Sequence, residues 1–143
     1  MDRQGVIDAA LELVRSGRAF VFATVDGGGF PQVRWMGGGY LEEPLTIYMA
    51  AAAESRKMAQ IAVHPEAQLM LQNADLSRVA TLTGTARAVT EPSVKRRVFA
   101  GIPGSSEYFS GPDDPAFGVV KFVCSRIEML GLAEGMTPSV ADI

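Results

Sequence analysis

Two strand-like runs joined by a glycine-rich turn constrain the fold of this chain more than any other feature. Residues 19–25, AFVFATV, are apolar and rich in aromatic and β-branched side chains, and residues 31–36, PQVRWM, form a second run of strand type. The intervening residues 26–29, DGGG, favour a tight reversal of the chain. Because these glycines join a strand to a strand, they predict an antiparallel hairpin and not a dinucleotide-binding strand–turn–helix unit.

Further strand-like segments follow at short intervals, with helical patterns between some of them. Strands are expected at 45–49, 67–72, 79–89 and 117–127, helices at 4–16, 55–63 and 92–100, and a long surface loop at 101–116. The pattern indicates a mainly β fold with peripheral helices, in which an antiparallel six-stranded sheet closes into a small barrel. Side chains fill barrels of this size, so a ligand is expected on the outside or between subunits.

Composition limits the classes of protein that this chain can represent. At 143 residues and 48% hydrophobic content, a single domain over 1–143 is expected, with 133–143 as a loose tail. A net charge of −3 argues against a nucleic-acid or anionic-membrane surface. The absence of a long apolar stretch or a signal-peptide pattern predicts no membrane span, and a single cysteine fits a cytoplasmic location.

The chain has one histidine and one cysteine, which restricts its chemistry. His64 precedes Pro65 at an expected helix end, and Cys124 lies in an apolar strand where a packed thiol is expected. No metal site and no nucleophilic triad is therefore predicted, and no side chain is assigned as a catalytic acid or base. Any catalysis is expected to depend on a cofactor.

The segment 53–58, AESRKM, is the best candidate for an anion site. Ser55, Arg56 and Lys57 begin a helix, where the free N–H groups and the helix dipole disfavour cations by roughly 0.3–1 kcal/mol. A bound phosphate would accept hydrogen bonds from the N–H groups, the hydroxyl and both cations. The alternative is that Ser55 only caps the helix while both cations are solvated.

Four sequence blocks in this order resemble the flavin-binding split-barrel proteins related to pyridoxamine 5′-phosphate oxidase, particularly the short general-stress-protein-like members. The blocks are AFVFATV at 19–25, GGGFPQVRWM at 27–36, TIYMAAAAESRKMAQI at 46–61 and TLTGTARAV at 81–89. The resemblance spans about residues 5–130. It implies an FMN-binding split barrel that forms a homodimer, with one flavin in each of two clefts across the interface.

The resemblance also implies a set of cofactor-binding residues. Arg56 and Lys57 would bind the FMN phosphate with support from Ser55, and Arg34 would reach the phosphate or the ribityl chain. The flavin ring would be lined by the backbone of Trp35 and Met36, and by Ala50 and Ala51. For Trp35, a position in the core or the dimer interface is the alternative.

The function implied by the resemblance is flavin-mediated electron or hydride transfer to an unknown small substrate. Ala51 stands where family members often carry threonine, and the chain stops soon after Leu132, so oxidation of pyridoxamine phosphate itself is not expected. Two alternatives remain open. One is a non-catalytic flavin-binding or sensing module, and the other is a relative that binds a deazaflavin or haem in the same cleft.

Overall fold

A computed structural model describes residues 1–42, 45–135 and 137–143 of the chain. Its helices and strands, in chain order, are α1 (Arg3–Ser16), β1 (Phe20–Val25), β2 (Pro31–Met36), β3 (Tyr40–Glu42), β4 (Thr46–Ala52), α2 (Arg56–Val63), β5 (Glu66–Gln72), β6 (Arg78–Val89), α3 (Pro92–Gly101), α4 (Ser105–Tyr108), β7 (Phe117–Gly131), a 3₁₀ turn (Leu132–Glu134) and β8 (Ser139–Asp142). None of the helices in the described ranges is long and apolar enough to cross a membrane.

All strand pairs of the described sheet are antiparallel. The strand order is β2-β1-β5-β6-β7-β4-β3, and β8 pairs with β7. The predicted mainly β architecture with peripheral helices is confirmed, and it has the split-barrel fold. Over the residues described, however, the sheet has eight strands where six were predicted, and its hydrogen-bonded path from β2 to β3 is open and does not close into a ring.

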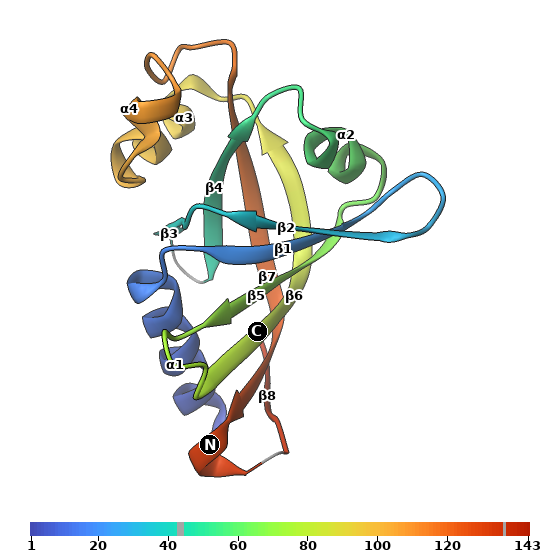
Figure 1. The fold of residues 1–143 in the computed structure, drawn as a ribbon, viewed down its shortest axis with the longest axis vertical. Coiled ribbons are helices and arrows are strands. Elements are labelled where there is room, and N and C mark those ends of the chain that lie inside the picture. Colours follow the sequence, from blue (N-terminus) through green and yellow to red (C-terminus); the bar gives the residue numbers. More distant parts are fainter. Residues whose placement is uncertain (43–44, 136) are drawn as a thin grey trace.

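The long strands β6 and β7 run along the molecule, and α2 lies at the side of the sheet, beside β6 (Figure 1). The α1 helix lies beside the lower part of the sheet and buries Val6, Ala10 and Leu13, which recur at helical spacing. The α3 and α4 helices lie at the opposite end, where they cover a smaller apolar cluster that includes Val98 and Phe117. The main core, built around Phe20, Phe22 and Phe122, fills the space between α1 and the curved sheet.

The predicted hairpin is confirmed, and Asp26 explains its tight turn. One carboxylate oxygen of Asp26 accepts hydrogen bonds of 2.9 Å from the backbone N–H groups of Gly28 and Phe30. These bonds fix the register in which Phe22 pairs with Arg34. The turn therefore determines where the Arg34 side chain leaves the sheet.

The prediction that 133–143 is a loose tail is wrong for residues 139–142. Position 136 lies outside the described residues. Residues Ser139–Asp142 form β8, in which Ala141 is buried and pairs with Ile127. An Arg126–Asp142 ion pair of 3.1 Å and a hydrogen bond from Arg3 Nε to the Asp142 carbonyl hold the segment. Four residues are too short to show a strand period, and their pairing depends on a free edge of β7.

Candidate functional site

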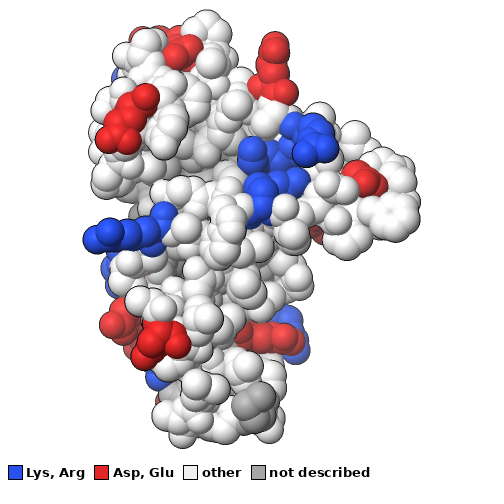
Figure 2. Space-filling model, in the orientation of Figure 1, with Lys and Arg blue, Asp and Glu red and all other residues white. Residues whose placement is uncertain are grey.

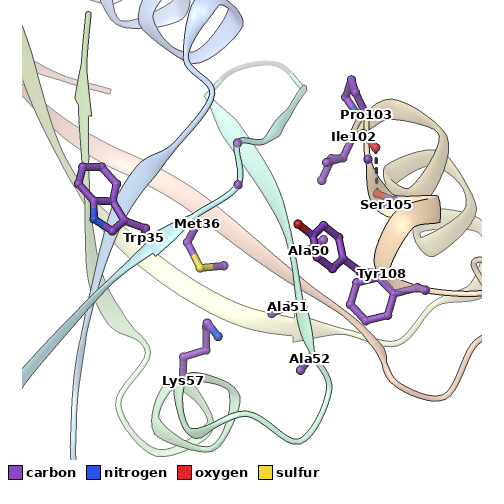
Figure 3. Close-up of a pocket in the computed structure, with 14 residues that line it drawn as sticks. Trp35, Met36, Ala50, Ala51, Ala52, Lys57, Ile102, Pro103, Ser105 and Tyr108 are labelled. Atoms are coloured by element: carbon purple, nitrogen blue, oxygen red, sulfur yellow. Dashed lines mark hydrogen bonds between the residues drawn. The ribbon is translucent and has the colours of Figure 1, made fainter. Parts of the chain in front are cut away.

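A cavity of about 360 Å³ lies between β2, β4 and the segment that joins α3 to α4. Its size falls within the roughly 300–1,000 Å³ typical of small-molecule sites. We call it the β4 cavity, and its lining comprises Trp35, Met36, Gly37, Gly38, Ala50, Ala51, Ala52, Lys57, Ile102, Pro103, Gly104, Ser105, Tyr108 and Phe109. Figure 3 shows Met36 and Lys57 on one side of it and the α4 segment on the other, with β4 between them.

Small residues at the end of β4 keep this cavity open. Ala50, Ala51 and Ala52 end the strand, and Ala51 pairs with Gly118 of β7. A Cβ atom on Gly118 would lie 2.9 Å from the Ala51 carbonyl oxygen, so the two strands can approach this closely only with glycine there. The short side chains of Ala50, Ala51 and Ala52 leave room beside β4 for a flat ligand.

The opposite wall was missed by the sequence analysis, which predicts only a long surface loop at 101–116. The structure places the short helix α4 there, and Ile102 and Ser105 are buried. Ser105 Oγ donates a 2.9 Å hydrogen bond to the Ile102 carbonyl oxygen, which stabilises the turn (Figure 3). The apolar residues Ile102, Tyr108 and Phe109 within this glycine- and proline-rich stretch were the available signal.

Arg34 is held in place by a network that joins β1, β2 and α2. Its Nη1 donates to the Phe22 carbonyl, to Thr24 Oγ1 and to the Gln32 carbonyl at 2.8–3.1 Å, and its Nη2 donates to Gln60 Oε1 at 3.2 Å. Thr24 also donates a 2.6 Å hydrogen bond to Gln60 Oε1. These acceptors are all neutral, so the network positions the guanidinium and leaves its charge uncompensated.

Thr24 and Gln60 are positioning residues that the sequence analysis did not identify. Thr24 is 1% exposed and occupies an inward position of β1, in line with Phe20 and Phe22. A hydroxyl on the buried face of an otherwise apolar strand needs a partner. That single polar residue at an inward position was the signal in the sequence.

Arg34, Arg56 and Lys57, which we call the cation cluster, meet at the start of α2. Burial, followed by the charge of Arg56, lowers the pKa of the Arg34 guanidinium below its ordinary value. Burial, followed by the charge of Arg34, likewise lowers the pKa of Lys57. Within the described residues none of the three forms an ion pair with a carboxylate. Figure 2 shows Lys and Arg atoms gathered on the surface beside α2.

Ser55 occupies the N-cap position of α2 but does not act as a side-chain cap within the part of the chain described. Its Oγ is buried and has no hydrogen-bond partner among the described residues. A buried hydroxyl in this condition loses about 1–3 kcal/mol of hydrogen bonding. An anion bound at the start of α2 would supply the missing acceptor.

The structure brings the predicted site residues to one region, although not all of them face the β4 cavity. Five of them line it: Trp35, Met36, Ala50, Ala51 and Lys57. Ser55, Arg34 and Arg56 lie beside Lys57 at the helix start. The Trp35 indole is 65% exposed and points away from Met36, so a position in the core of one chain is excluded for it (Figure 3).

Solved structures with the same fold include proteins from several bacteria. A general stress protein 26-related protein of Clostridium acetobutylicum superposes with a TM-score of 0.82 at 17% identity, covering 100% of this chain and 97% of that one. An FMN-binding, pyridoxamine 5′-phosphate oxidase-related protein of Nostoc punctiforme gives a TM-score of 0.63 at 18% identity, covering 100% and 97%. A heme-binding protein of Mycobacterium smegmatis gives 0.77 at 14% identity, covering 99% and 60%.

The sequence itself identifies the family. None of the curated proteins matches the chain. The family model of pyridoxamine 5′-phosphate oxidase, by contrast, matches residues 6–131, which is most of the chain and includes both the cation cluster and β4. The chain therefore belongs to the pyridoxamine 5′-phosphate oxidase family.

Proposed function

We propose that this protein binds FMN, with the phosphate at the cation cluster and the flavin ring in the β4 cavity. The main support for the proposal is that Arg34, Arg56 and Lys57 lie together beside the Ser55 hydroxyl, which has no hydrogen-bond partner among the described residues. A phosphate dianion would restore the charge balance and accept the hydrogen bond of Ser55. The FMN-binding relative from Nostoc punctiforme supports the same choice of ligand.

The cavity is suited to the flavin ring because its walls are apolar and backbone-rich. Met36 is 5% exposed, and with Ala50 and Ile102 it offers apolar contacts to a flat ring. The backbone around Gly37 and Gly38 would supply hydrogen-bond donors and acceptors at the ring edge. When bound, FMN supplies electron or hydride transfer, whereas the protein's side chains bind it, orient it and limit access. On this basis we propose an oxidoreductase acting on a small substrate.

A comparison of FMN with riboflavin, which lacks the phosphate, tests the proposal. The wild-type protein should bind FMN more tightly by roughly 3 kcal/mol, about a hundredfold, because several charge-assisted bonds reach the phosphate. The double variant Arg56→Ala/Lys57→Ala should lose most of this preference and remain folded. Arg87→Ala/Arg96→Ala removes two exposed charges elsewhere and should leave it unchanged. Equal affinity of the wild type for both ligands, or no binding of FMN, would refute the proposal.

We further propose that the protein is a homodimer with the flavin at the interface. Trp35, Val21 and Met70 lie in a row across β2, β1 and β5, since Val21 pairs with both of the others. Trp35 and Met70 are exposed large apolar side chains, and Val33 is a third on the same face. Exposed apolar patches of this kind mark protein interfaces.

Sedimentation of the wild-type protein and of Trp35→Glu tests the dimer. The wild type should sediment with twice the mass of one chain, and the variant should dissociate because it buries a charge in an apolar contact. Phe30→Glu, at the exposed hairpin tip, is the control and should remain dimeric. A monomeric wild-type protein would contradict the proposal.

Haem is a second candidate ligand because the Mycobacterium smegmatis relative binds heme. His64 is the C-cap of α2, at the other end of the helix from Lys57. Seven residues of helix span about 10 Å, so His64 is remote from the cation cluster. A titration with haem followed at the Soret band, in competition with FMN, decides between the two ligands.

A further inference from the structure

A second hollow, of about 600 Å³, borders the glycine segment 37–39, part of which also lines the β4 cavity. We call it the arginine cavity, because Arg15 and Arg18 line it. The two hollows share Gly37, Gly38, Ile102 and Pro103 in their linings. They are therefore neighbouring spaces separated by the backbone of a glycine run and by two apolar residues.

The backbone at Arg18 touches this glycine segment. A Cβ atom on Gly38 would lie 3.7 Å from the carbonyl oxygens of both Gly17 and Arg18, so the two backbone segments are in contact. Gly38 has a φ of +99°, a conformation that favours glycine, and no side chain is present at this point. Arg18 also lines a third hollow, which reaches Trp35. Arg18 thus lines a hollow that shares Gly37 and Gly38 with the β4 cavity.

The charged side chains that line these three hollows are all positive. Across their described linings the ionisable groups of fixed charge are Lys57, Arg15 and Arg18, and none is Asp or Glu. The whole chain carries a net charge of −3, so the positive lining is local. In the part of the chain described, neither arginine forms an ion pair or a side-chain hydrogen bond.

The two arginines differ in how well the helix dipole explains a cation at their positions. Arg15 lies in the last turn of α1, where a cation is favoured by the helix dipole. Arg18 follows the C-cap residue Gly17 and lies beyond the last turn, where the effect of the dipole falls off, so the dipole explains it less well. Arginine in a site of this kind binds carboxylates and phosphates through two parallel hydrogen bonds.

We propose that Arg18, with Arg15 beside it, binds the anionic group of a small substrate or electron donor whose other end enters the β4 cavity. This inference rests on the proposed function, because FMN has one phosphate and the cation cluster already accounts for it. Arg18 and Arg15 would therefore bind the anionic group of a second molecule. The substrate class is an organic carboxylate or phosphate ester with an apolar body, since the shared walls Ile102 and Pro103 are apolar.

Binding of three simple aromatic probes tests the inference. Benzoate and phenyl phosphate carry the two candidate anions, and benzyl alcohol carries neither. Calorimetry on the flavin-free protein and shifts of the visible band on the FMN-loaded protein should both give tighter binding of an anionic probe than of benzyl alcohol. The better of the two anionic probes assigns the substrate as a carboxylate or a phosphate ester.

Arg18→Gln should weaken the preferred anionic probe at least tenfold and leave benzyl alcohol unchanged. Arg18→Lys should recover part of the affinity because it keeps the charge, and Arg96→Gln on α3 is the control with no expected effect. FMN affinity should be the same in Arg18→Gln as in the wild type. Arg18 and Arg96 are both exposed, so neither change should alter the melting temperature.

Three results would overturn the inference. They are equal binding of all three probes to the wild type, unchanged anion affinity in Arg18→Gln, and a loss of FMN affinity in Arg18→Gln as large as in Arg56→Ala/Lys57→Ala. The last result would make Arg18 part of the cofactor site. If FMN does not bind the wild type at all, the proposed function fails, and the calorimetry on the flavin-free protein still decides whether Arg18 binds anions.

Discussion

Thr24 Oγ1 donates a 2.6 Å hydrogen bond to Gln60 Oε1, which joins β1 to α2 and places two acceptors around the Arg34 guanidinium. The bond therefore links the β1–β2 hairpin, on which Arg34 lies, to the helix that contributes Arg56 and Lys57. The relative position of the three cations depends on it. Substitution of Thr24 should consequently affect both stability and phosphate binding.

We expect Thr24→Val to lower the free energy of unfolding by about 1–3 kcal/mol, because Gln60 and Arg34 each lose a buried partner while the side-chain volume is kept. FMN binding should weaken about tenfold, roughly 1.4 kcal/mol, because Arg34 is no longer fixed. Chemical denaturation and FMN titration measure the two effects. Thr83→Val, which removes an exposed hydrogen bond to Gln68, is the control. A Thr24→Val protein with wild-type FMN affinity would show that Arg34 needs no such support.

Ser55→Ala should leave the stability of the ligand-free protein unchanged or slightly raised, since the hydroxyl it removes is buried and unpaired within the described structure. The same change should weaken FMN binding about tenfold, because one hydrogen bond to the phosphate is lost. Asp2→Ala is the matched cap variant. Its carboxylate accepts a 2.8 Å hydrogen bond from Gly5 N, so its loss should cost about 1 kcal/mol. A similar destabilisation in both variants would mean that Ser55 is an ordinary helix cap.

Gly84→Ala should destabilise the fold by about 3 kcal/mol or more, because the new methyl group has no space. Gly84 lies at a register shift between β6 and β7, and a Cβ atom there would clash with the Val123 carbonyl oxygen. Gly27→Ala, in the exposed hairpin turn, meets no described atom within 4 Å and should be tolerated. Thermal unfolding of the two variants checks this. Comparable melting temperatures would require β7 to shift away from Gly84 at little cost.

Stability should fall at alkaline pH because of Cys124. Burial raises the pKa of this thiol from 9.0 to about 11, so between these values the folded state keeps a proton that the unfolded state has released. The stabilisation is complete below pH 9 and is lost as the pH rises through 11, with a slope of up to about 1.4 kcal/mol per pH unit. Urea titrations from pH 8 to 11 measure it.

Cys124→Ala isolates this contribution from that of Tyr48, whose pKa is also raised, by burial and then by Glu42. The variant should lose the fall in stability that begins near pH 9 and keep the contribution of Tyr48, which Lys57, with its lowered pKa, opposes. An identical slope in the two proteins would exclude Cys124 as its source.

The sheet was predictable where strand signals are long and local. The DGGG turn, the apolar and β-branched run of β1 and the apolar run of β7 identify their elements without tertiary information. The strands β3 and β8 have three and four residues, and their pairing depends on an edge supplied from elsewhere in the chain. The described path ends at β2 and β3, and whether these two strands pair with each other was not deducible from local pattern.

The candidate site was predictable only where charged residues occupy positions that the local structure disfavours. Arg56 and Lys57 at a helix start are unfavourable without an anion, and this conflict is visible in the sequence. Arg34 could be placed near them only by family resemblance. Gln60 and Ser105 have polar side chains of common type, and only the folded chain shows what they contact.

The pairing of β8 with β7 has a consequence for the behaviour of the protein at high concentration. Residues Arg126–Met129 of β7 direct their outer backbone groups to Ser139–Asp142, and Ile143 N donates a further hydrogen bond to the Ser125 carbonyl oxygen. Exposed strand edges of this kind recruit strands from other molecules and lead to aggregation. In the described sheet β8 pairs with β7 alone and becomes the edge at this point, and with four residues it is the kind of short edge strand that limits pairing with other molecules.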